Sequence, residues 1–484
     1  MLGKPSQRLA GRGNAPMGEL RSAGGEWREA SLTARIRLVH PLVLGGVVAA
    51  LAVAGLASFQ PLYVAVAIGA GSYLLILFTD PALGLAVFTL LTFFGELGHG
   101  ASPIKAAGAL VVLVWILQVV RRDRPAKFIG WSQPHVFYLA MGLVVFSAAS
   151  TLWAADPGTA KSTAIRLALN VMLFVVVPTF VTNRRDLVVV LYAYVFGAAT
   201  TALYGVASGN AQSDASGRLA GGIGDPNELA ALLVPGIVLA VVLIAAESRN
   251  LLVRLALVLA IITDFFALGA AQSRGGFVAL AAAVLVGVVF AGRQRAKLIA
   301  ALVLVATVSV ALIAAAGIQL GRVSSFGGGG TGRIDIWSVA YRVFKSHPVA
   351  GVGIGNFTVV EPQYAAGNLN LPRVDLVLDQ HKVAHNTYLN VLADLGLVGL
   401  TVFGLLILLV LRTLVRRIRA TRLDDDRWLN AVSRGLLVAL SGLLVAYVFI
   451  SAQYEKQLWL LLGVALAASG LRRGLGTARP DAQR

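Results

Sequence analysis

The amino-acid sequence predicts an all-α protein that crosses a membrane many times, and its composition carries this prediction. Of the 484 residues, 57% are hydrophobic and only 13% are charged, whereas about 25% of residues are charged in soluble domains. The mean hydropathy is +0.78. An ordinary soluble domain is therefore excluded. The sequence has no cysteine, so disulfides and thiolate metal sites are excluded as well.

The apolar stretches define the candidate membrane spans, because a spanning helix needs roughly 20 mainly apolar residues. Several stretches are short, so we expect about fourteen spans within a range of twelve to fourteen. The candidates lie at 41–59, 62–79, 82–97, 104–120, 134–153, 165–182, 186–207, 227–246, 251–269, 276–291, 298–319, 385–411, 431–451 and 457–471.

The spans divide the chain into five parts. Residues 1–37 are rich in Arg and Gly, and the apolar segment after them exceeds the hydrophobic region of a signal peptide, which is about 7 to 15 residues. We therefore expect 1–37 to be an uncleaved, disordered cytoplasmic tail. Residues 38–319 hold the first eleven spans, and 320–384 form a long loop. Residues 385–471 hold the last three spans, and 472–484 form a second cytoplasmic tail.

The formal net charge of +18 is explained by topology. Lys and Arg stay on the cytoplasmic side of short loops, and 29 of the 41 Lys and Arg residues fall in the tails, in alternate connectors or at Arg434. We therefore place both termini inside and expect no nucleic acid partner. The basic, cytoplasmic connectors are 121–127, 184–185, 249–254, 293–297 and 412–427. The remaining connectors face outward; they are 98–103, 154–164, 208–226, 270–275, 320–384 and 452–456.

The outward loop 320–384 is long enough to have structure of its own. A glycine hinge at 327–330 precedes a predicted amphipathic helix at 333–346, which Pro348 helps to end. Its apolar stripe at helical spacing consists of Ile334, Trp337, Tyr341 and Phe344. Such a helix lies on the outer membrane surface or caps a cavity, and the first role is favoured.

A glycine-spaced segment, Gly351 to Phe357, follows that helix. Its backbone amides could approach a phosphate. It lacks the strand, helix and acidic residue that accompany a nucleotide-binding fingerprint. We therefore favour a compact turn that closes the loop.

Three arginines lie in separate outward connectors beside predicted spans: Arg218, Arg274 and Arg333. An isolated interfacial Arg commonly reaches to lipid phosphates. Three together, each flanked by Gly or Ser, instead suit a diphosphate, because the planar guanidinium binds phosphate through two parallel hydrogen bonds. We therefore expect them to bind an anionic headgroup at the membrane surface.

Two further polar residues, Asn227 and Asp264, can be explained without a direct role in the chemistry. Asn227 follows Pro226 at the start of a span, and a helix cap is the expected role. Asp264 lies in the outer half of the span at 251–269, either as a functional buried carboxylate or as the partner of an Arg such as Arg274. We favour the partner role.

His385 is the leading candidate for a catalytic base. Asn386, Asn390 and Asp394 recur every four residues below it, and Tyr388 lies between them. Polar groups inside a membrane are costly unless they face a bundle interior or a wet cavity. His385 would then lie at the mouth of that cavity, with a neutral imidazole available near pH 7. A hydrogen-bonded interfacial His is the alternative.

A metal site is not expected. His381 and His385 are four residues apart, but the Glu of the metalloprotease motif and a third ligand are missing. The sequence therefore predicts neither a metal nor another cofactor.

Several motifs resemble those of the O-antigen ligase and O-antigen polymerase superfamily over roughly residues 210–400. They are Arg218 with 225–227, Ser273-Arg274-Gly275, Thr331-Gly332-Arg333, Trp337, His347-Pro348, 351–357, His385-Asn386-x-Tyr388-Leu389 and 396–400. Their order and common outward placement carry the resemblance.

The resemblance implies a metal-independent, inverting glycosyltransferase with a fold like that of the membrane-embedded C superfamily. Such enzymes move a glycan from undecaprenyl diphosphate to an acceptor hydroxyl outside the bacterial cytoplasmic membrane. His385 would activate the acceptor, and Arg218 and Arg274 would hold the diphosphate. Arg333, Asn386, Tyr388 and Asn227 would contribute to substrate binding. The implied partners are the lipid-linked donor, a glycan or lipid-linked acceptor, membrane lipids, and a chain-length regulator or a flippase.

A transporter or flippase of lipid-linked sugars is the alternative function. Transporters commonly show internal repeats and broken helices around a midplane site. Here no repeat is evident, and the polar residues gather at the outward ends of the spans. We therefore favour the enzyme.

Overall fold

The computed structural model describes residues 61–95, 103–120, 132–208, 217–247, 250–290, 333–366, 383–423 and 426–471, with a few positions between 303 and 315. The chain divides into two units, Met1–Ser72 and Tyr73–Arg484. In the first unit only the start of helix α2 is described. Everything below concerns the second unit.

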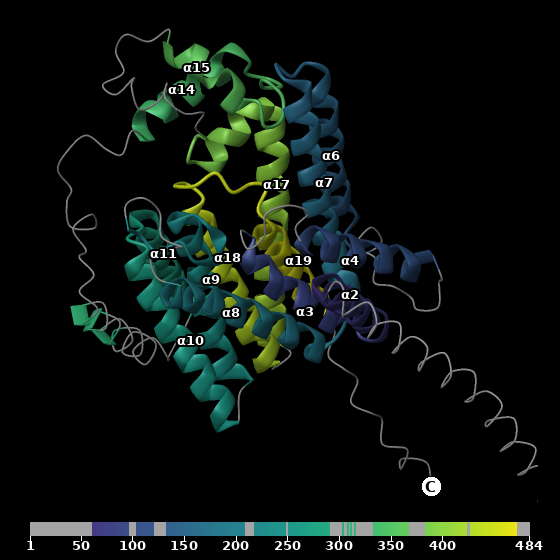
Figure 1. The fold of residues 1–484 in the computed structure, drawn as a ribbon, viewed down its shortest axis with the longest axis vertical. Helices are drawn as coiled ribbons and strands as arrows, with labels where there is room; N and C mark the ends of the chain where they lie inside the picture. Colours follow the sequence, from purple (N-terminus) through teal and green to yellow (C-terminus); the bar gives the residue numbers. More distant parts are fainter. Residues whose placement is uncertain are drawn as a thin grey trace, which may run out of the picture. The chain divides into compact units, whose positions relative to one another are not determined.

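All regular elements among the described residues are helices (Figure 1). The α-helices are α2 Pro61–Thr79, α3 Pro81–Leu91, α4 Pro103–Val120, α6 Pro134–Ala149, α7 Pro157–Phe180, α8 Arg184–Ala207, α9 Pro226–Ala246, α10 Leu251–Ala270, α11 Arg274–Phe290, α14 Arg333–Ser346, α15 Phe357–Ala366, α17 Thr387–Leu423, α18 Arg427–Ala446 and α19 Lys456–Gly470. Short 3₁₀ turns lie at Thr92–Phe94, Ser150–Leu152 and Gly221–Ile223.

Helix starts follow directly from the sequence. Proline occupies the first turn of α3, α7 and α9, where its missing N–H costs nothing. The preceding residues Asp80, Asp156 and Asp225 accept hydrogen bonds from the free backbone amides of those turns. Each Asp-Pro pair therefore ends a connector and begins a helix.

The all-helical, multi-span prediction is confirmed at a coarse level. Within the described residues, seven helices are long and apolar enough to cross a membrane: α7, α8, α9, α10, α18, α6 with its terminal 3₁₀ turn, and the part of α17 from Thr387 to Thr421. The shorter apolar helices fall on other predicted spans. Several predicted segments lie outside the described residues: both tails, the hinge at 327–330 and the span at 41–59. Of the predicted span at 298–319, only isolated positions are described. Fourteen spans therefore stay a prediction.

Several predicted span boundaries differ from the observed helix ends. Helix α7 begins at Pro157 rather than 165, because Asp156 caps it. Helix α17 continues through most of the basic connector to Leu423, since Arg and Leu favour helix and no Gly or Pro interrupts them there. Helix α18 ends at Ala446 rather than 451. Residues 447–455 thus form a connector of their own.

The connectors meet in two separate sets. At one end, Ser150 and Asp156 bond to segment 354–356, segment 218–219 bonds to 270–271, and Thr387 bonds to segment 447–452. At the other, Arg184 and Trp428 both bond to Glu247, and Arg434 donates to the carbonyl of Phe290. We call these the site end and the basic end. This grouping matches the predicted alternation of outward and cytoplasmic connectors. The assignment of the site end to the outer face stays a prediction.

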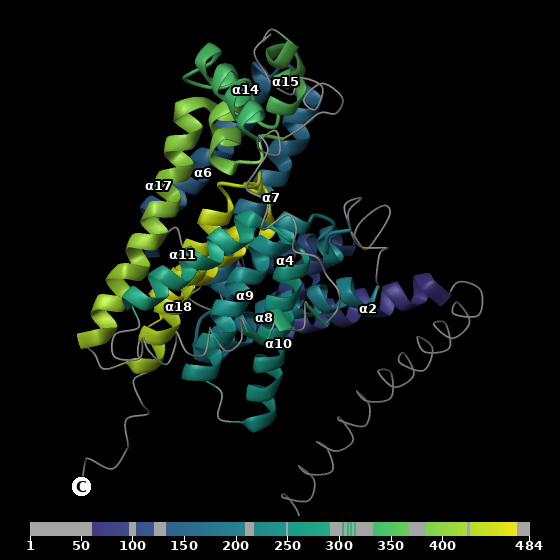
Figure 2. The same cartoon turned by 90° about the vertical axis from the view of Figure 1, so that its left-hand side faces the viewer.

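Helices α9 and α18 lie at the centre of the packing. Helix α9 packs against α8, α10, α11 and α18, while α19 packs against α7 and α17. Figure 2 shows α17 extending past this group of helices toward α14 and α15. Two glycines of α18, Gly435 and Gly442, allow α18 to pack closely on α9. A Cβ at Gly442 would lie 2.8 Å from Val234 of α9.

Helix α17 is broken at Gly396, whose φ of 64° and ψ of −164° are not helical. The adjacent segment 348–353 supplies the missing partners. Leu397 and Val398 donate to the carbonyls of Pro348 and Val349, and Val352 donates to Ala393. A break at membrane depth is tolerated only when its backbone is bonded in this way.

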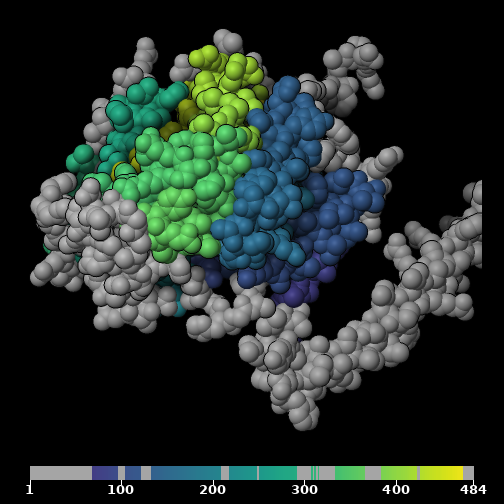
Figure 3. All heavy atoms as spheres, turned by 90° about the horizontal axis from the view of Figure 1, so that it is seen from above, coloured from purple at the N-terminus to yellow at the C-terminus, as the bar shows by residue number. Residues whose placement is uncertain are grey.

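A second, smaller core holds α14 and α15 against the start of α17. Its buried side chains on α14 are Ile336, Val339, Ala340 and Val343. The predicted stripe is not the face that packs on this core: Ile334 is 72% exposed and Tyr341 48% exposed. The helix itself has the predicted bounds, but it turns its smaller aliphatic residues inward. Figure 3 shows this segment, in green, covering one face beside α6 and α7 in blue.

Candidate functional site

Arg218 is buried, although Arg is seldom buried unless its charge is bonded. Its Nε donates to the carbonyl of Ala271 (2.9 Å), and its Nη2 donates to Asn227 Oδ1 (2.9 Å). The neighbouring backbone amide of Leu219 donates to Ala270 (3.2 Å). The Arg218 loop is thereby fixed to the link between α10 and α11.

Asn227 joins that loop to the start of α11. Its Oδ1 also accepts a hydrogen bond from the Ser273 hydroxyl (3.0 Å). The cap of α9 is Asp225, whose carboxylate accepts from the amides of Asn227 and Glu228. The expected capping role of Asn227 is therefore wrong, because Asp225 precedes Pro226 and already occupies that position.

Arg274 is the first residue of α11 and is exposed. Two residues before it, Gln272 has a φ of 47°, a conformation that residues other than Gly adopt rarely. Ser273 caps the helix by accepting from the amide of Gly276 (3.2 Å). We call Arg218, Asn227, Ser273 and Arg274 the arginine cluster; a helix N-terminus at its centre favours an anion.

Asp264 does not pair with Arg274, so the favoured interpretation was wrong. Its carboxylate is fully buried, and neither oxygen has a hydrogen-bond partner among the described residues. The side chain points into the contact of α8, α9 and α10, where a Cβ on Gly236 would lie 2.9 Å from Asp264 Oδ2. It therefore faces the bundle and not the arginine cluster.

His385 lies two residues before α17, is partly buried and has a φ of 47°. Asn386 caps α17 by accepting from the amides of Tyr388 (3.0 Å) and Leu389 (3.1 Å). The Tyr388 hydroxyl donates to the carbonyl of Leu444 on α18 (2.7 Å). The polar groups of Asn386 and Tyr388 thus fix the first turn of α17, which directly follows His385 and Asn386 in the chain.

The polar stripe below His385 faces the interior as predicted, since Asn386, Asn390 and Asp394 are all buried. Asp394 accepts from the Phe357 amide (2.8 Å), from Asn390 Nδ2 (2.8 Å) and from the Tyr454 hydroxyl (3.3 Å). Burial and the nearby Asp394 charge raise the pKa of Tyr454 well above its usual value. Tyr454 therefore stays a hydrogen-bond donor.

The glycine-spaced segment 351–357 is the compact turn that the sequence favoured. Gly351, Gly353 and Gly355 have φ of 66°, 99° and 70°. The amide of Gly353 donates to the Asp394 carbonyl, and the amide of Ile354 donates to Ser150 Oγ. These amides are engaged by the protein, so they do not form a phosphate cradle.

The connector 447–455 links the start of α17 to the arginine cluster. Thr387 donates from its amide to Tyr447 O and from its hydroxyl to Ile450 O. On the other side, Phe449 packs so closely on α11 that a Cβ on Gly275 would lie 2.7 Å from the Phe449 Cβ. The connector 447–455 therefore contacts both Thr387, two residues after His385, and Gly275, the residue after Arg274.

Arg333 is apart from this arrangement. It opens α14, which packs on α15 and α17, whereas the arginine cluster lies on the chain before α9 and at the starts of α9 and α11. No group of three or more metal-ligating residues occurs among the described residues, and His381 lies outside them. The structure thus brings together Arg218, Asn227 and Arg274, and it connects His385 to them through residues 447–455.

Residues 255–404 match the O-antigen ligase family. The resemblance drawn from the motifs is thereby confirmed for this part of the chain. No match was found among the curated proteins. The family match supports a glycan ligase or polymerase at a coarse level, in a multi-pass membrane protein.

The O-antigen ligase match includes α10, α11, α14, α15 and the first half of α17. It therefore contains Arg274, Arg333, His385, Asn386 and Tyr388, while Arg218 and Asn227 precede it. The hydrogen bonds from Arg218 and Ser273 to Asn227 attach these earlier residues to the matched region.

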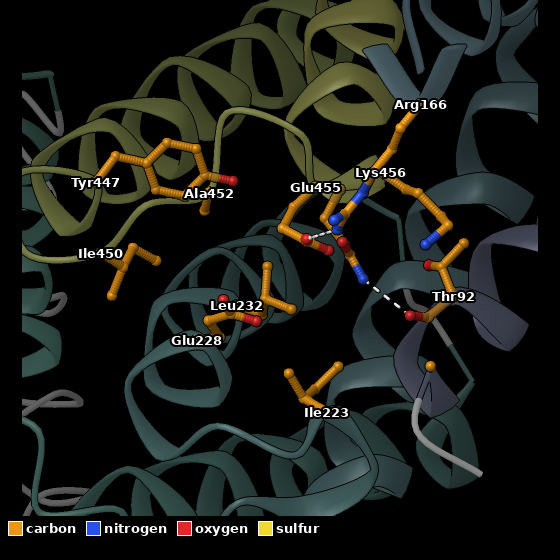
Figure 4. A pocket seen from close by; sticks show the side chains of 12 residues that line it. Thr92, Arg166, Ile223, Glu228, Leu232, Tyr447, Ile450, Ala452, Glu455 and Lys456 are labelled. Atoms are coloured by element: carbon orange, nitrogen blue, oxygen red, sulfur yellow. Dashed lines mark hydrogen bonds and ion pairs between the residues drawn. The ribbon is translucent and has the colours of Figure 1, made fainter. Parts of the chain in front are cut away.

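Sequence reasoning missed a pocket of about 130 Å³ beside the arginine cluster. We call it the Tyr447 pocket; it is lined by Thr92, Gly95, Arg166, Ile223, Glu228, Leu232, Tyr447, Ile450, Ala452, Glu455, Lys456 and Gln457. Figure 4 shows these side chains converging from α7, α9 and the chain from Tyr447 onward. The polar run 451–457 between two apolar spans was the signal that could have located it.

Proposed function

We propose that the protein is a membrane glycosyltransferase that moves a glycan from undecaprenyl diphosphate to an acceptor hydroxyl, as an O-antigen or surface polysaccharide polymerase or ligase. The observation that carries the proposal is the arginine cluster at the start of α11, linked by residues 447–455 to the start of α17 below His385. We place the reaction on the outer face of the cytoplasmic membrane, where the positive-inside pattern puts the site end.

In the proposed reaction, the His385 imidazole takes the proton of the acceptor hydroxyl. The acceptor oxygen forms a bond to the anomeric carbon on the face opposite the diphosphate. The bond from that carbon to the diphosphate oxygen breaks, and its electron pair leaves with undecaprenyl diphosphate. One bond forms as one breaks, so the anomeric configuration inverts. His385 then releases its proton to water.

The arginine cluster supports the leaving group. A departing diphosphate gains negative charge, and fixed cations at that position stabilise the transition state. Arg274 is exposed at a helix N-terminus and suits direct contact with the diphosphate. Arg218 is bonded within the protein and positions the loop as well as adding charge. This chemistry calls on no metal ligand.

The test is an in vitro reaction of the purified protein with undecaprenyl-diphosphate-linked repeat units, with and without a separate acceptor. A ladder of products without added acceptor identifies a polymerase. A single addition to an added acceptor identifies a ligase. No product in either reaction, from protein that remains folded, contradicts the proposal.

His385→Ala should lower the transfer rate by about 10² to 10⁴-fold, the usual contribution of a general base. His135→Ala is the matched control, because His135 is exposed at the start of α6, near the basic end. It should keep full activity. Near-normal turnover by the His385 variant would remove it from the mechanism.

A further inference from the structure

We propose that the Tyr447 pocket is a sugar subsite that binds one monosaccharide unit of the glycan through its hydroxyl groups. The pocket lies at the site end, between α7, α9, the end of α3 and the chain from Tyr447 to Gln457. None of the residues assigned to the transfer reaction lines it. The proposal rests on the proposed function, because it takes the ligand to be part of the glycan that the enzyme transfers.

Two buried polar atoms at this pocket have no partner. The Tyr447 hydroxyl and the Gln457 Oε1 make no hydrogen bond within the described residues, and their side chains are buried, with 0% and 2% of their residues' surface exposed. Nearly all buried polar groups in proteins are bonded, so each exception calls for an explanation. A sugar hydroxyl both donates and accepts, and it can satisfy either atom.

The Gln457 side chain is held in position for this role. Its Nε2 donates to the carbonyl of Thr92 (2.9 Å), which leaves Oε1 as the remaining acceptor. Burial raises the pKa of Tyr447 well above its usual value, so its hydroxyl keeps its proton. The pocket therefore offers one fixed donor and one fixed acceptor.

The charges around the pocket balance. Arg166 forms an ion pair with Glu455, and the lining also includes Lys456 and Glu228. Two cations and two carboxylates give no net attraction for a diphosphate, which the arginine cluster suits better. Carboxylates do accept hydrogen bonds from hydroxyl groups. This lining favours a neutral polyol.

The remaining lining and the size also fit a sugar ring. Ile223, Leu232 and the Tyr447 ring provide apolar surface for the C–H faces of a pyranose. The volume is about 130 Å³, below the roughly 300 Å³ at which sites for drug-sized ligands begin. One monosaccharide unit, rather than a long oligosaccharide, is therefore the occupant.

The pocket is placed to serve the transfer reaction. Glu228 is adjacent in the chain to Asn227 of the arginine cluster. Tyr447 accepts, through its carbonyl, the hydrogen bond from Thr387 beside His385. A sugar unit held here would thus lie next to the elements that carry both reacting partners.

The experiment measures binding of D-glucose, D-galactose and N-acetyl-D-glucosamine to the full-length protein in detergent by saturation-transfer difference NMR. At least one sugar should receive saturation, and a tenfold excess of inorganic phosphate should not displace it. Tyr447→Phe removes only the unpartnered hydroxyl and should weaken binding about five- to tenfold, as expected for one hydrogen bond.

Ser433→Ala is the matched control. Ser433 carries another buried hydroxyl without a partner among the described residues, on α18, but it does not line the pocket. This variant should bind sugar like the unmodified protein. Saturation of none of the three sugars, displacement by phosphate, or unchanged binding by Tyr447→Phe would overturn the sugar subsite.

His385→Ala separates this proposal from the proposed function, because the variant should bind sugars normally. If it binds sugars but also transfers glycans normally, the catalytic assignment fails and the subsite stands. If it loses transfer while the unmodified protein binds no sugar, the subsite fails alone.

Discussion

At the site end of the bundle, the described connectors hold residues with positive φ, whereas the described connectors of the basic end hold none and are closed by caps and ion pairs. Nine described residues have positive φ. Eight lie in site-end connectors. The ninth is Gly396 in α17, and the two residues after it donate hydrogen bonds to the carbonyls of Pro348 and Val349. The nine residues are Gly217, Gly221, Gly224, Gln272, Gly351, Gly353, Gly355, His385 and Gly396.

The basic end is built for stability. Glu247 accepts hydrogen bonds from Arg184 (2.7 Å) and from Trp428 Nε1 (2.7 Å), and the Arg184 guanidinium lies 4.4 Å from the centre of the Trp428 ring. Asn183, Asn250 and Asp426 cap their helices. Uncommon backbone conformations persist where the surrounding fold holds them, and they concentrate at functional sites. The difference therefore supports the site end as the place of chemistry.

The largest expected effect within this comparison concerns Arg274. Arg274→Ala should lower kcat/KM for the lipid-linked donor about 100-fold, since it removes a cation from the departing diphosphate. Arg274→Lys keeps the charge but loses the planar fork, so it should recover only part of that loss. Thermal stability should stay unchanged because the side chain is exposed.

Arg218→Ala is the comparison variant. Arg218 is buried and bonds to Ala271 and Asn227, so its loss should lower both activity and thermal stability. Unchanged donor kinetics in Arg274→Ala would remove Arg274 from the site. Equal losses of stability in the two variants would contradict their different burial.

Much of the fold could be predicted because hydropathy and Asp-Pro pairs are local signals. The predicted helix at 333–346 has the observed bounds, and α8, α9 and α10 begin and end within two residues of prediction. The length of α17 could not be predicted from apolar length, because a membrane helix continues into water where Arg and Leu favour it. The inward face of α14 depends on α15 and α17, which a single-helix pattern does not include.

The site could be predicted only in part, because sequence motifs identify candidate residues but do not show which side chains contact one another. The polar stripe of Asn386, Asn390 and Asp394 required burial, and the structure agrees. The bonds of Asn227 to Arg218 and Ser273 join positions 9 and 46 residues apart, and no local pattern encodes such a bond. Asp264 shows the same limit, since helical spacing did not reveal that it faces Gly236.

A smaller effect is expected at the basic end. Glu247→Ala removes the shared acceptor of Arg184 and Trp428, and should lower the free energy of unfolding by about 1 kcal/mol. Transfer activity at temperatures where the protein is folded should not change. Glu247→Gln keeps an acceptor oxygen for Trp428 and should lose less stability. A loss of turnover in folded Glu247→Ala would show that the two ends are not independent.

An effect of the same size as that of Glu247→Ala is expected from the backbone strain at His385. His385→Ala and His385→Gly both lack the imidazole, so both should lose transfer activity to the same extent, but only glycine adopts a φ of 47° without steric cost. The glycine variant should therefore be more stable by about 1 kcal/mol, measured by thermal unfolding in detergent. Gln272 offers a matched pair, because its φ is also 47° and it carries no proposed chemistry. Gln272→Gly should likewise be more stable than Gln272→Ala. Equal stability within both pairs would mean that the site end stores no backbone strain.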